Sequence, residues 1–142
     1  MITTEDLDNM GYSDYMRERA RLYSMTPMHM VEEFATTMDQ PKDPDMSAGL
    51  IYEEFDEWRW ERQVNRPKDY RSETEIKELA DLVYVIYGYA HSRGWDLDEA
   101  LRRVHKSNME RCVWPDGSIK RREDGKILKN PDAPKIQLDD LV

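Results

Sequence analysis

The sequence contains one cysteine, Cys112, so the chain cannot form an internal disulfide and carries no sign of an oxidising compartment. It contains no apolar stretch near the ~18 residues that a membrane-spanning helix needs. Its first residues lack the basic start and apolar run of a signal peptide. With a net charge of −9, the surface should repel polymeric nucleic acid and anionic membranes. We therefore expect a cytoplasmic protein that binds neither membranes nor polymeric nucleic acid.

Two common metal-binding patterns are also missing. A di-iron carboxylate bundle needs a glutamate three residues before a histidine, but Thr26, Gly88 and Arg102 occupy those positions. None of the three histidines has an adjacent aspartate, which excludes phosphohydrolases built on a His-Asp pair. The sequence therefore excludes both of these metalloenzyme classes.

The periodicity that is present is helical, and short segments with proline or glycine interrupt it. It predicts four helices, because apolar residues recur at helical spacing between these breaks. The predicted starts are the candidate caps Thr26, Asp45 or Ser47, and Ser72, with the fourth start at about Asp96; the helices run to about Met38, Val64, Arg93 and Met109. We expect an all-α fold, a four-helix bundle, with an N-terminal extension (1–25), a helical catalytic core (26–112) and an irregular C-terminal tail (113–142).

The third predicted helix is apolar on two sides. One stripe includes Ile76, Leu79 and Val83, while Leu82 and Val85 lie on the opposite side. A helix that is apolar all round is buried on both sides, and the apolar fraction of 39% makes the core lean. In so short a chain, we expect a second copy to supply part of the covering surface.

Five carboxylates lie on the second and third predicted helices. At ~100° per residue, Glu53, Glu54 and Glu57 share one side of the second helix. Glu78 and Asp81 stand one turn apart on the third, beside apolar neighbours. Crowded carboxylates repel strongly unless cations compensate them, and oxygen ligands select Mg²⁺, Mn²⁺ or Ca²⁺. Since Mg²⁺ completes its shell with water and substrate phosphates, the pattern predicts an incomplete cage for a phosphate ligand.

A simpler interpretation exists for each acidic group. The first group alone resembles a solvated acidic face, and Glu78 could pair with Lys77 or Arg71 at the surface. Asp81 is harder to dismiss because it precedes the apolar run from Leu82 to Ala90. A non-enzymatic helical adaptor with an acidic face remains the alternative of another class.

The acidic pattern and three further segments resemble the all-α nucleoside triphosphate pyrophosphohydrolases, a superfamily that includes MazG-like proteins and phosphoribosyl-ATP pyrophosphohydrolase. The acids form E-E-x-x-E followed by E-x-x-D. The other similar segments are K-E-L-A-D-L-V-Y-V from Lys77, V-H-K-S-N-M from Val104 and D-G-K-I-L-K-N-P from Asp124. The similarity extends from about Val31 to Pro134.

The resemblance implies hydrolysis between the α- and β-phosphates of a nucleotide by a homodimer or homotetramer. It implies that Mg²⁺, with Mn²⁺ as a substitute, is bound by Glu53, Glu54, Glu57, Glu78 and Asp81. It also implies that Glu54 or Glu57 acts on the attacking water. We expect a free nucleoside triphosphate as substrate, with phosphoribosyl-ATP as the alternative.

The C-terminal part of the chain is basic, because residues 101–135 carry ten Lys or Arg and five Asp or Glu. A basic segment on an acidic protein suits a phosphorylated small molecule. The candidate phosphate-binding residues are Lys106, Asn108, Arg111, Lys126 and Lys129. Asn130 stands where many family members have glycine, and asparagine tolerates the same left-handed backbone. Base-stacking candidates, each also suited to packing, are Trp58, Trp60, Trp95 and Tyr84.

Overall fold

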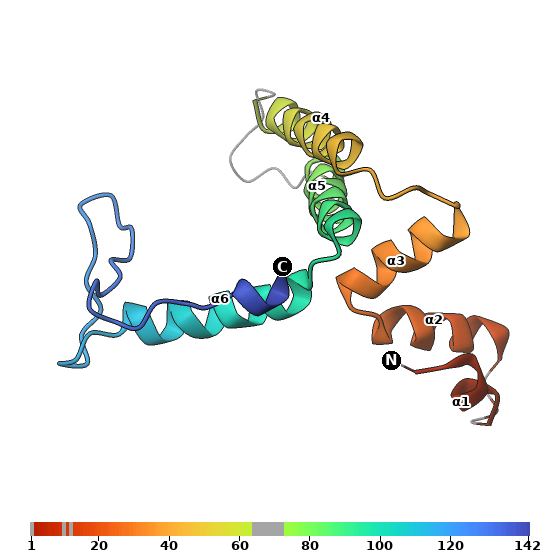
Figure 1. Cartoon of the computed structure of the whole chain (residues 1–142), viewed down its shortest axis with the longest axis horizontal. Coiled ribbons are helices and arrows are strands. Elements are labelled where there is room, and N and C mark those ends of the chain that lie inside the picture. The colour runs from red at the N-terminus through yellow and green to blue at the C-terminus, as the bar shows by residue number, and fades with distance from the viewer. Residues whose placement is uncertain (1, 10, 12, 64–72) are drawn as a thin grey trace. The chain divides into compact units, whose positions relative to one another are not determined.

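A computed structural model describes residues 2–9, 11, 13–63 and 73–142 (Figure 1). Within these ranges it contains six α-helices, a short 3₁₀ helix and no strand, only the isolated bridge Arg121–Ile127, so the all-α prediction is confirmed. The chain divides into two compact units, residues 1–95 and 96–142, and each is described by itself. The predicted four-helix bundle stays a prediction, because the fourth predicted helix belongs to the second unit.

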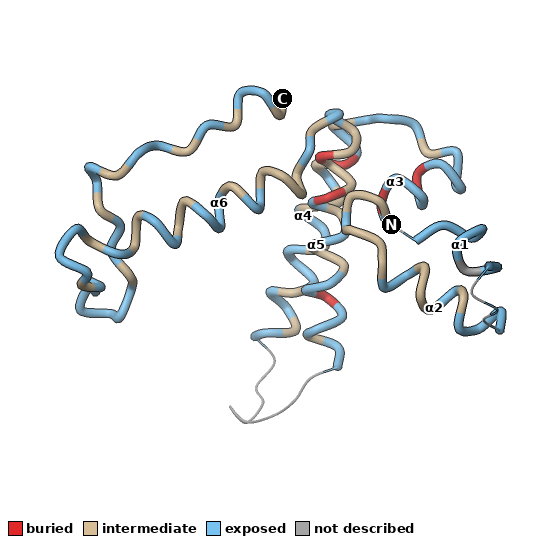
Figure 2. Tube along the Cα trace, turned by 90° about the horizontal axis from the view of Figure 1, so that it is seen from below, coloured by how far each residue is buried: buried red, intermediate tan, exposed pale blue. Residues whose placement is uncertain are grey.

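The first unit contains five helices: α1 (Thr4–Asn9), α2 (Asp14–Ser24), α3 (Pro27–Thr37), α4 (Pro44–Gln63) and α5 (Glu73–Arg93). The predicted extension is thus helical, and an ion pair between Arg21 and Glu33 joins α2 to α3. The α4 and α5 helices form the most extensive helix pair of this unit (Figures 1 and 2). This pair positions the acidic residues.

The helix starts follow capping chemistry, with one correction. The Thr26 hydroxyl accepts a hydrogen bond from the His29 amide at 3.4 Å, as predicted. The predicted cap of α4 at Asp45 or Ser47 is wrong, because the Asp43 carboxylate accepts from the Met46 amide at 3.1 Å and α4 begins at Pro44. Proline suits the first helical position, where its missing N–H has no partner to lose. The predicted cap Ser72 lies outside the described residues.

The core of the first unit is small and lies along α3 and α5. Its buried apolar residues are Val31 and Ala35 of α3 and Tyr87 and Ala90 of α5, shown in red in Figure 2. Ser47 on α4 and Glu78 on α5 are the buried polar residues of the described chain. A charged residue that is this strongly buried needs a partner, which makes Glu78 a functional candidate.

The two sides of α5 differ in burial. Leu82 and Val85, which share a side with the acids, are half-buried, whereas Ile76, Leu79 and Val83 are 68%, 41% and 49% exposed. The same stripe is buried further along, at Tyr87 and Ala90, where α5 packs near α3. The first unit therefore covers this side of α5 only in part and leaves Ile76, Leu79 and Val83 exposed. No helix among the described residues is long and apolar enough to cross a membrane.

The second unit contains α6 (Leu97–Cys112), the tail and the 3₁₀ helix η1 (Asp139–Leu141). Asp96 caps α6 by accepting from the Glu99 amide at 3.0 Å, in agreement with the predicted start, and α6 ends three residues beyond the predicted Met109. The Arg103 guanidinium donates to both carboxylate oxygens of Asp140, at 2.6 and 2.8 Å. This link explains why α6 and the tail form one unit, whereas the sequence suggested a boundary after Cys112.

Candidate metal centre and neighbouring pocket

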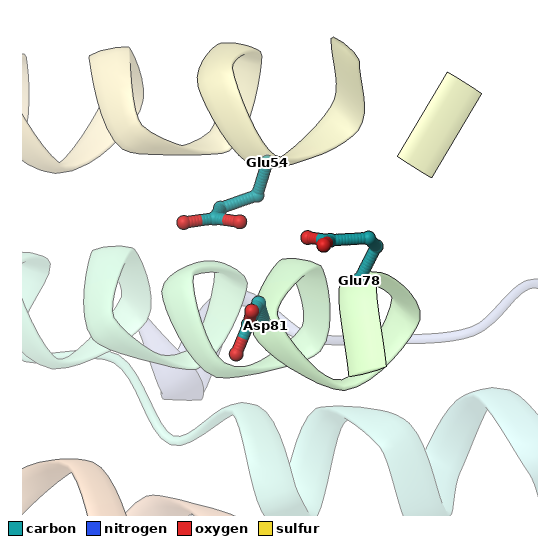
Figure 3. A group of neighbouring side chains, drawn as sticks. All are labelled: Glu54, Glu78 and Asp81. Carbon is teal, nitrogen blue, oxygen red and sulfur yellow. The ribbon is translucent and has the colours of Figure 1, made fainter. Parts of the chain in front are cut away.

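Three of the predicted metal ligands converge between α4 and α5. One carboxylate oxygen from each of Glu54, Glu78 and Asp81 lies within 4.8 Å of the others. Figure 3 shows Glu54 and Glu78 extending from opposite helices into the space between them, with Asp81 on α5 beside Glu78. The i, i+3 spacing puts Glu78 and Asp81 on one face of α5, and the α4–α5 pairing brings that face to Glu54.

The cluster contains polar atoms whose hydrogen-bonding capacity is unused. Oε2 of Glu54 and Oε2 of Glu78 are buried, and no described group donates a hydrogen bond to either atom. Glu78 is only 8% exposed. Buried acceptors without a donor are costly, and a hard divalent cation that prefers carboxylate oxygen would supply the missing interaction. The donor set therefore fits a divalent metal ion.

Burial and mutual repulsion change the acidity of the cluster. Burial raises the pKa of Glu54, and the negative charges of Glu57, Asp81 and Glu78 raise this pKa further. Burial also raises the pKa of Glu78; the nearby Lys77 opposes this effect, while a hydrogen bond and charge repulsion from Glu57 add to it. A cluster that resists ionisation by itself gains most from a cation.

Lys77 supplies one positive charge at the edge of this cluster. Its Nζ lies 2.6 Å from Oδ2 of Asp81 and 3.7 Å from Oε1 of Glu78. The hydrogen bond to Asp81 is the main reason that the pKa of Lys77 is raised. The Lys77 side chain is 64% exposed, so its ammonium group has space to move aside when another cation binds. The predicted pairing of Glu78 with Lys77 is therefore observed, but Glu78 is buried and not a surface group. Arg71, the other predicted partner, lies outside the described residues.

The remaining two acids of the predicted set, Glu53 and Glu57, are not among the three converging carboxylates. Glu57 is exposed but close enough to Glu54 and Glu78 to influence both, as their raised pKa values indicate. Glu53 is exposed and is not one of the three converging carboxylates. Roles for Glu53 and Glu57 as ligands stay predictions.

All five predicted phosphate-binding residues belong to the second unit. Lys106 lies 3.8 Å from the Glu110 carboxylate, and Asn108 is half-buried inside α6, which continues to Cys112. Lys126 and Lys129 are exposed in the tail. The Nε atom of Arg111 is buried and has no hydrogen-bond partner among the described residues.

The tail turn differs from the one that the sequence suggested. The Asn130 amide donates to the Arg111 carbonyl at 2.8 Å, which joins the tail to the end of α6. Among the described non-glycine residues, Asp39 alone has a positive φ. Asn130 therefore does not adopt the left-handed conformation, and its replacement of glycine needs no such backbone.

A pocket of about 240 Å³ lies beside Glu54, whose side chain forms part of its wall. The pocket is enclosed by α3, the α3–α4 loop, α4 and α5, and its surface is mainly apolar. Its polar side chains include Gln40, Lys42 and His91. A concave, mostly apolar pocket with a few polar groups is the usual form of a small-molecule site.

The sequence identified one wall residue of this pocket as a base-stacking candidate. Tyr84 lines the pocket and packs edge-on against Phe34, with ring centroids 5.8 Å apart. Trp95 instead packs against Tyr89 at 5.9 Å, and Trp60 is 69% exposed. The loop residues Gln40 and Lys42 were missed, because they lie outside every helical stripe and no motif marks them.

A carboxylate cluster beside such a pocket, on paired helices, fits an all-helical hydrolase whose carboxylates hold a divalent cation. The family model for phosphoribosyl-ATP pyrophosphohydrolase matches residues 30–108, more than half of the chain. The chain belongs to this family, within the all-α nucleoside triphosphate pyrophosphohydrolase superfamily. A search of the curated proteins finds no match.

Family membership decides between enzyme and adaptor. The matched region contains α4, α5 and all five predicted acidic ligands. The chain is therefore a nucleotide pyrophosphohydrolase, and the non-enzymatic adaptor is not supported.

Proposed function

We propose that this protein hydrolyses the α–β phosphoanhydride of a ribo- or deoxyribonucleoside triphosphate in the cytoplasm, releasing the nucleoside monophosphate and pyrophosphate. Glu54, Glu78 and Asp81 hold Mg²⁺, for which Mn²⁺ substitutes. The observation that carries this proposal is the position of Glu54, which belongs both to the carboxylate cluster and to the wall of the pocket. A nucleotide whose base enters the pocket thus brings its phosphates to the cluster.

The chemistry requires charge compensation and a proton acceptor. When bound, the divalent ion neutralises phosphate charge and favours attack by water. The water oxygen forms a bond to the α-phosphorus, the bond from this phosphorus to the bridging oxygen breaks, and pyrophosphate leaves. The carboxylate of Glu57, exposed at the edge of the cluster, accepts the proton of the water. Glu54 is the alternative acceptor.

The leaving pyrophosphate carries negative charge that the acidic first unit does not balance. The basic segment 101–135 carries cations and amide donors of the kind that suit such a charge. We assign this role to the predicted residues Lys106, Asn108, Arg111, Lys126 and Lys129. The buried, unpaired Nε of Arg111 supports the assignment best, since a guanidinium donor gains most from an anionic partner.

The pocket favours a free nucleoside triphosphate over phosphoribosyl-ATP. The latter adds a ribose and a fourth phosphate to ATP, and this phosphate needs cations around it. Among the described residues that line the pocket, Lys42 and His91 are the only basic ones, and the remaining surface is mainly apolar. Phosphoribosyl-ATP remains the second candidate because it gives the family its name.

A substrate panel decides between the two candidates. The full chain is incubated with Mg²⁺ and each of the common ribo- and deoxyribonucleoside triphosphates, or with phosphoribosyl-ATP, and the products are separated by ion-exchange chromatography. We expect a monophosphate and pyrophosphate from at least one free triphosphate. Turnover of phosphoribosyl-ATP alone would favour the second candidate, and release of single phosphate would contradict α–β cleavage.

The assembly we propose is a homodimer or homotetramer. The surface formed by α3 and α5 exposes the apolar residues Met30, Ile76, Leu79 and Val83. These side chains border an apolar hollow of about 430 Å³. Contiguous exposed apolar surface of this kind marks an interaction site, and a second copy is the occupant we propose.

A further inference from the structure

The pocket beside Glu54 continues the groove in which the carboxylates lie. Ser47, Leu50 and Glu54 are spaced by four and three residues, so one face of α4 serves both the pocket and the cluster. The matching face of α5 carries Asp81, Val85, Gly88 and Ser92. Between Glu54 and Ser47 this groove extends ~10 Å, at 1.5 Å of rise per residue. A ligand with phosphates at the cluster therefore directs its nucleoside toward the pocket.

The pocket wall provides two aromatic rings and open space. The rings of Phe34 and Tyr84, at 87° to each other, both line it. Gly88 also lines it, and a Cβ added at Gly88 meets no atom within 4 Å. Glycine is the least favourable residue except proline inside a helix, and no neighbouring atom requires it here. The absence of a side chain at Gly88 therefore keeps space open for an occupant, and a planar base fits beside the rings.

Gln40, on the α3–α4 loop, lines this pocket, and hydrogen bonds fix its backbone. The Gln40 amide donates to the Ala35 carbonyl at 2.8 Å, and the Asp39 amide donates to the Thr36 carbonyl at 3.3 Å. This pair of bonds forms a Schellman motif, with Asp39 in the left-handed region at φ 48°. Pro41 follows and restricts the backbone further. The loop thus positions Gln40 before a ligand arrives, which lowers the ordering cost of binding.

The chemistry of Gln40 suits a base edge better than a phosphate. Its carboxamide offers both a donor and an acceptor, in the pattern that bases present on their edges. It carries no charge, unlike the neighbouring Lys42, which suits hydroxyl or phosphate oxygens. Gln40 is half-buried, so its hydrogen bonds are made away from bulk water.

We propose that Gln40 is the residue that reads the base of the substrate, which lies against the Phe34–Tyr84 ring pair in the pocket beside Glu54. This inference rests on the proposed function. Gln40 determines specificity and takes no part in hydrolysis. Gln40 determines which base is bound most tightly, whereas the carboxylate cluster takes part in the hydrolysis of every nucleotide.

The test compares Gln40→Ala and Gln40→Glu with a matched control, Gln63→Ala, at the exposed end of α4. The kcat/KM of each variant is measured for each triphosphate, and binding of the free nucleosides is measured by calorimetry without metal. We expect the preferred base of the wild type to lose at least ~10-fold in kcat/KM in Gln40→Ala, the size expected for one bidentate base contact. Its kcat should change less than ~3-fold, and its nucleoside affinity should fall in parallel.

The outcomes separate this inference from the proposed function. A base profile and nucleoside affinity unchanged in both Gln40 variants would overturn the role of Gln40, even with full turnover. An equal loss for every base, or a wild type without base preference, would overturn it as well. Failure of the proposed function has another signature, which is the absence of pyrophosphate release from any nucleotide by the wild type.

Discussion

At the residue scale, neighbouring acids of the same type have different environments. Glu53 and Glu54 are adjacent, yet Glu54 is half-buried against α5 and Glu53 is exposed. The ~100° between successive residues produces this difference. The acidic pattern predicted that the two helices contribute to one site, but which glutamate faces α5 depends on how the helices pack. Glu78 is the clearest case, because a glutamate is almost never so strongly buried unless it is paired.

The raised pKa values give a first prediction, for the metal-free protein. Between the ordinary pKa of 4.5 and its raised value in the folded state, Glu54 binds more protons when folded than when unfolded. Its contribution to the free energy of unfolding therefore falls as pH rises through that window. In EDTA, Glu54→Gln should have a higher Tm than the wild type near neutral pH, with the difference vanishing toward pH 4.5.

The control for this titration is Glu53→Gln, which removes an exposed charge from the same helix. Its Tm should follow the wild type at every pH, apart from a small constant offset. A Glu54→Gln variant whose Tm in EDTA is lower than that of the wild type near neutral pH would contradict the assigned repulsion.

At the element scale, the sequence predicted the positions of the helices better than the start of α4 or the conformation of the loop before it. Thr26 and Asp96 cap the helices that the pattern indicated, because both precede a clear apolar period. The predicted start of α4 was wrong, because several acids and a serine near Pro44 all resemble capping residues. Only the backbone geometry shows that Asp43 is the cap. The prolines of the α3–α4 segment predicted a loop there, but they did not predict its conformation. Its Schellman turn uses Asp39 where glycine is usual.

Gly88 on α5 gives the prediction that belongs to this scale. Gly88→Ala should raise the free energy of unfolding by ~0.5–1 kcal/mol, because alanine favours helix and its Cβ meets no atom. Gly88→Phe should fill the pocket instead and raise KM for the nucleotide at least ~10-fold. Chemical denaturation and steady-state kinetics measure the two effects.

Metal binding is the control for Gly88→Phe. The carboxylate cluster lies outside the filled space, so the Mn²⁺ affinity of this variant should remain within ~2-fold of the wild type. If the bulky variant kept its KM, or if it lost metal and substrate together, the pocket would not be the nucleoside site.

At the scale of the whole molecule, the all-α class and the acidic site were predictable from local patterns. The assembly of the parts was not, because it depends on which apolar faces meet. Ile76 and Val83 belong to a stripe that the sequence marks as buried, yet 68% and 49% of their surface is exposed in the single chain. The second copy that we propose would cover these exposed side chains.

This assembly predicts the behaviour of charged substitutions on α5. The wild type should be a dimer or larger by multi-angle light scattering, while the double variant Ile76→Glu and Val83→Glu should shift to a monomer and keep its helical circular dichroism. Tyr15→Glu, on the exposed surface of α2, serves as the control and should leave the mass unchanged. A monomeric wild type would rule out the second copy.

The most direct test of the central claim is Mn²⁺ binding, followed by electron paramagnetic resonance, in the wild type, Glu54→Gln and Glu53→Gln. If Glu54, Glu78 and Asp81 hold the metal, Glu54→Gln should weaken Mn²⁺ binding at least ~10-fold and abolish pyrophosphate release, whereas Glu53→Gln should retain most of both. Equal Mn²⁺ affinity in the wild type and Glu54→Gln would contradict the metal centre.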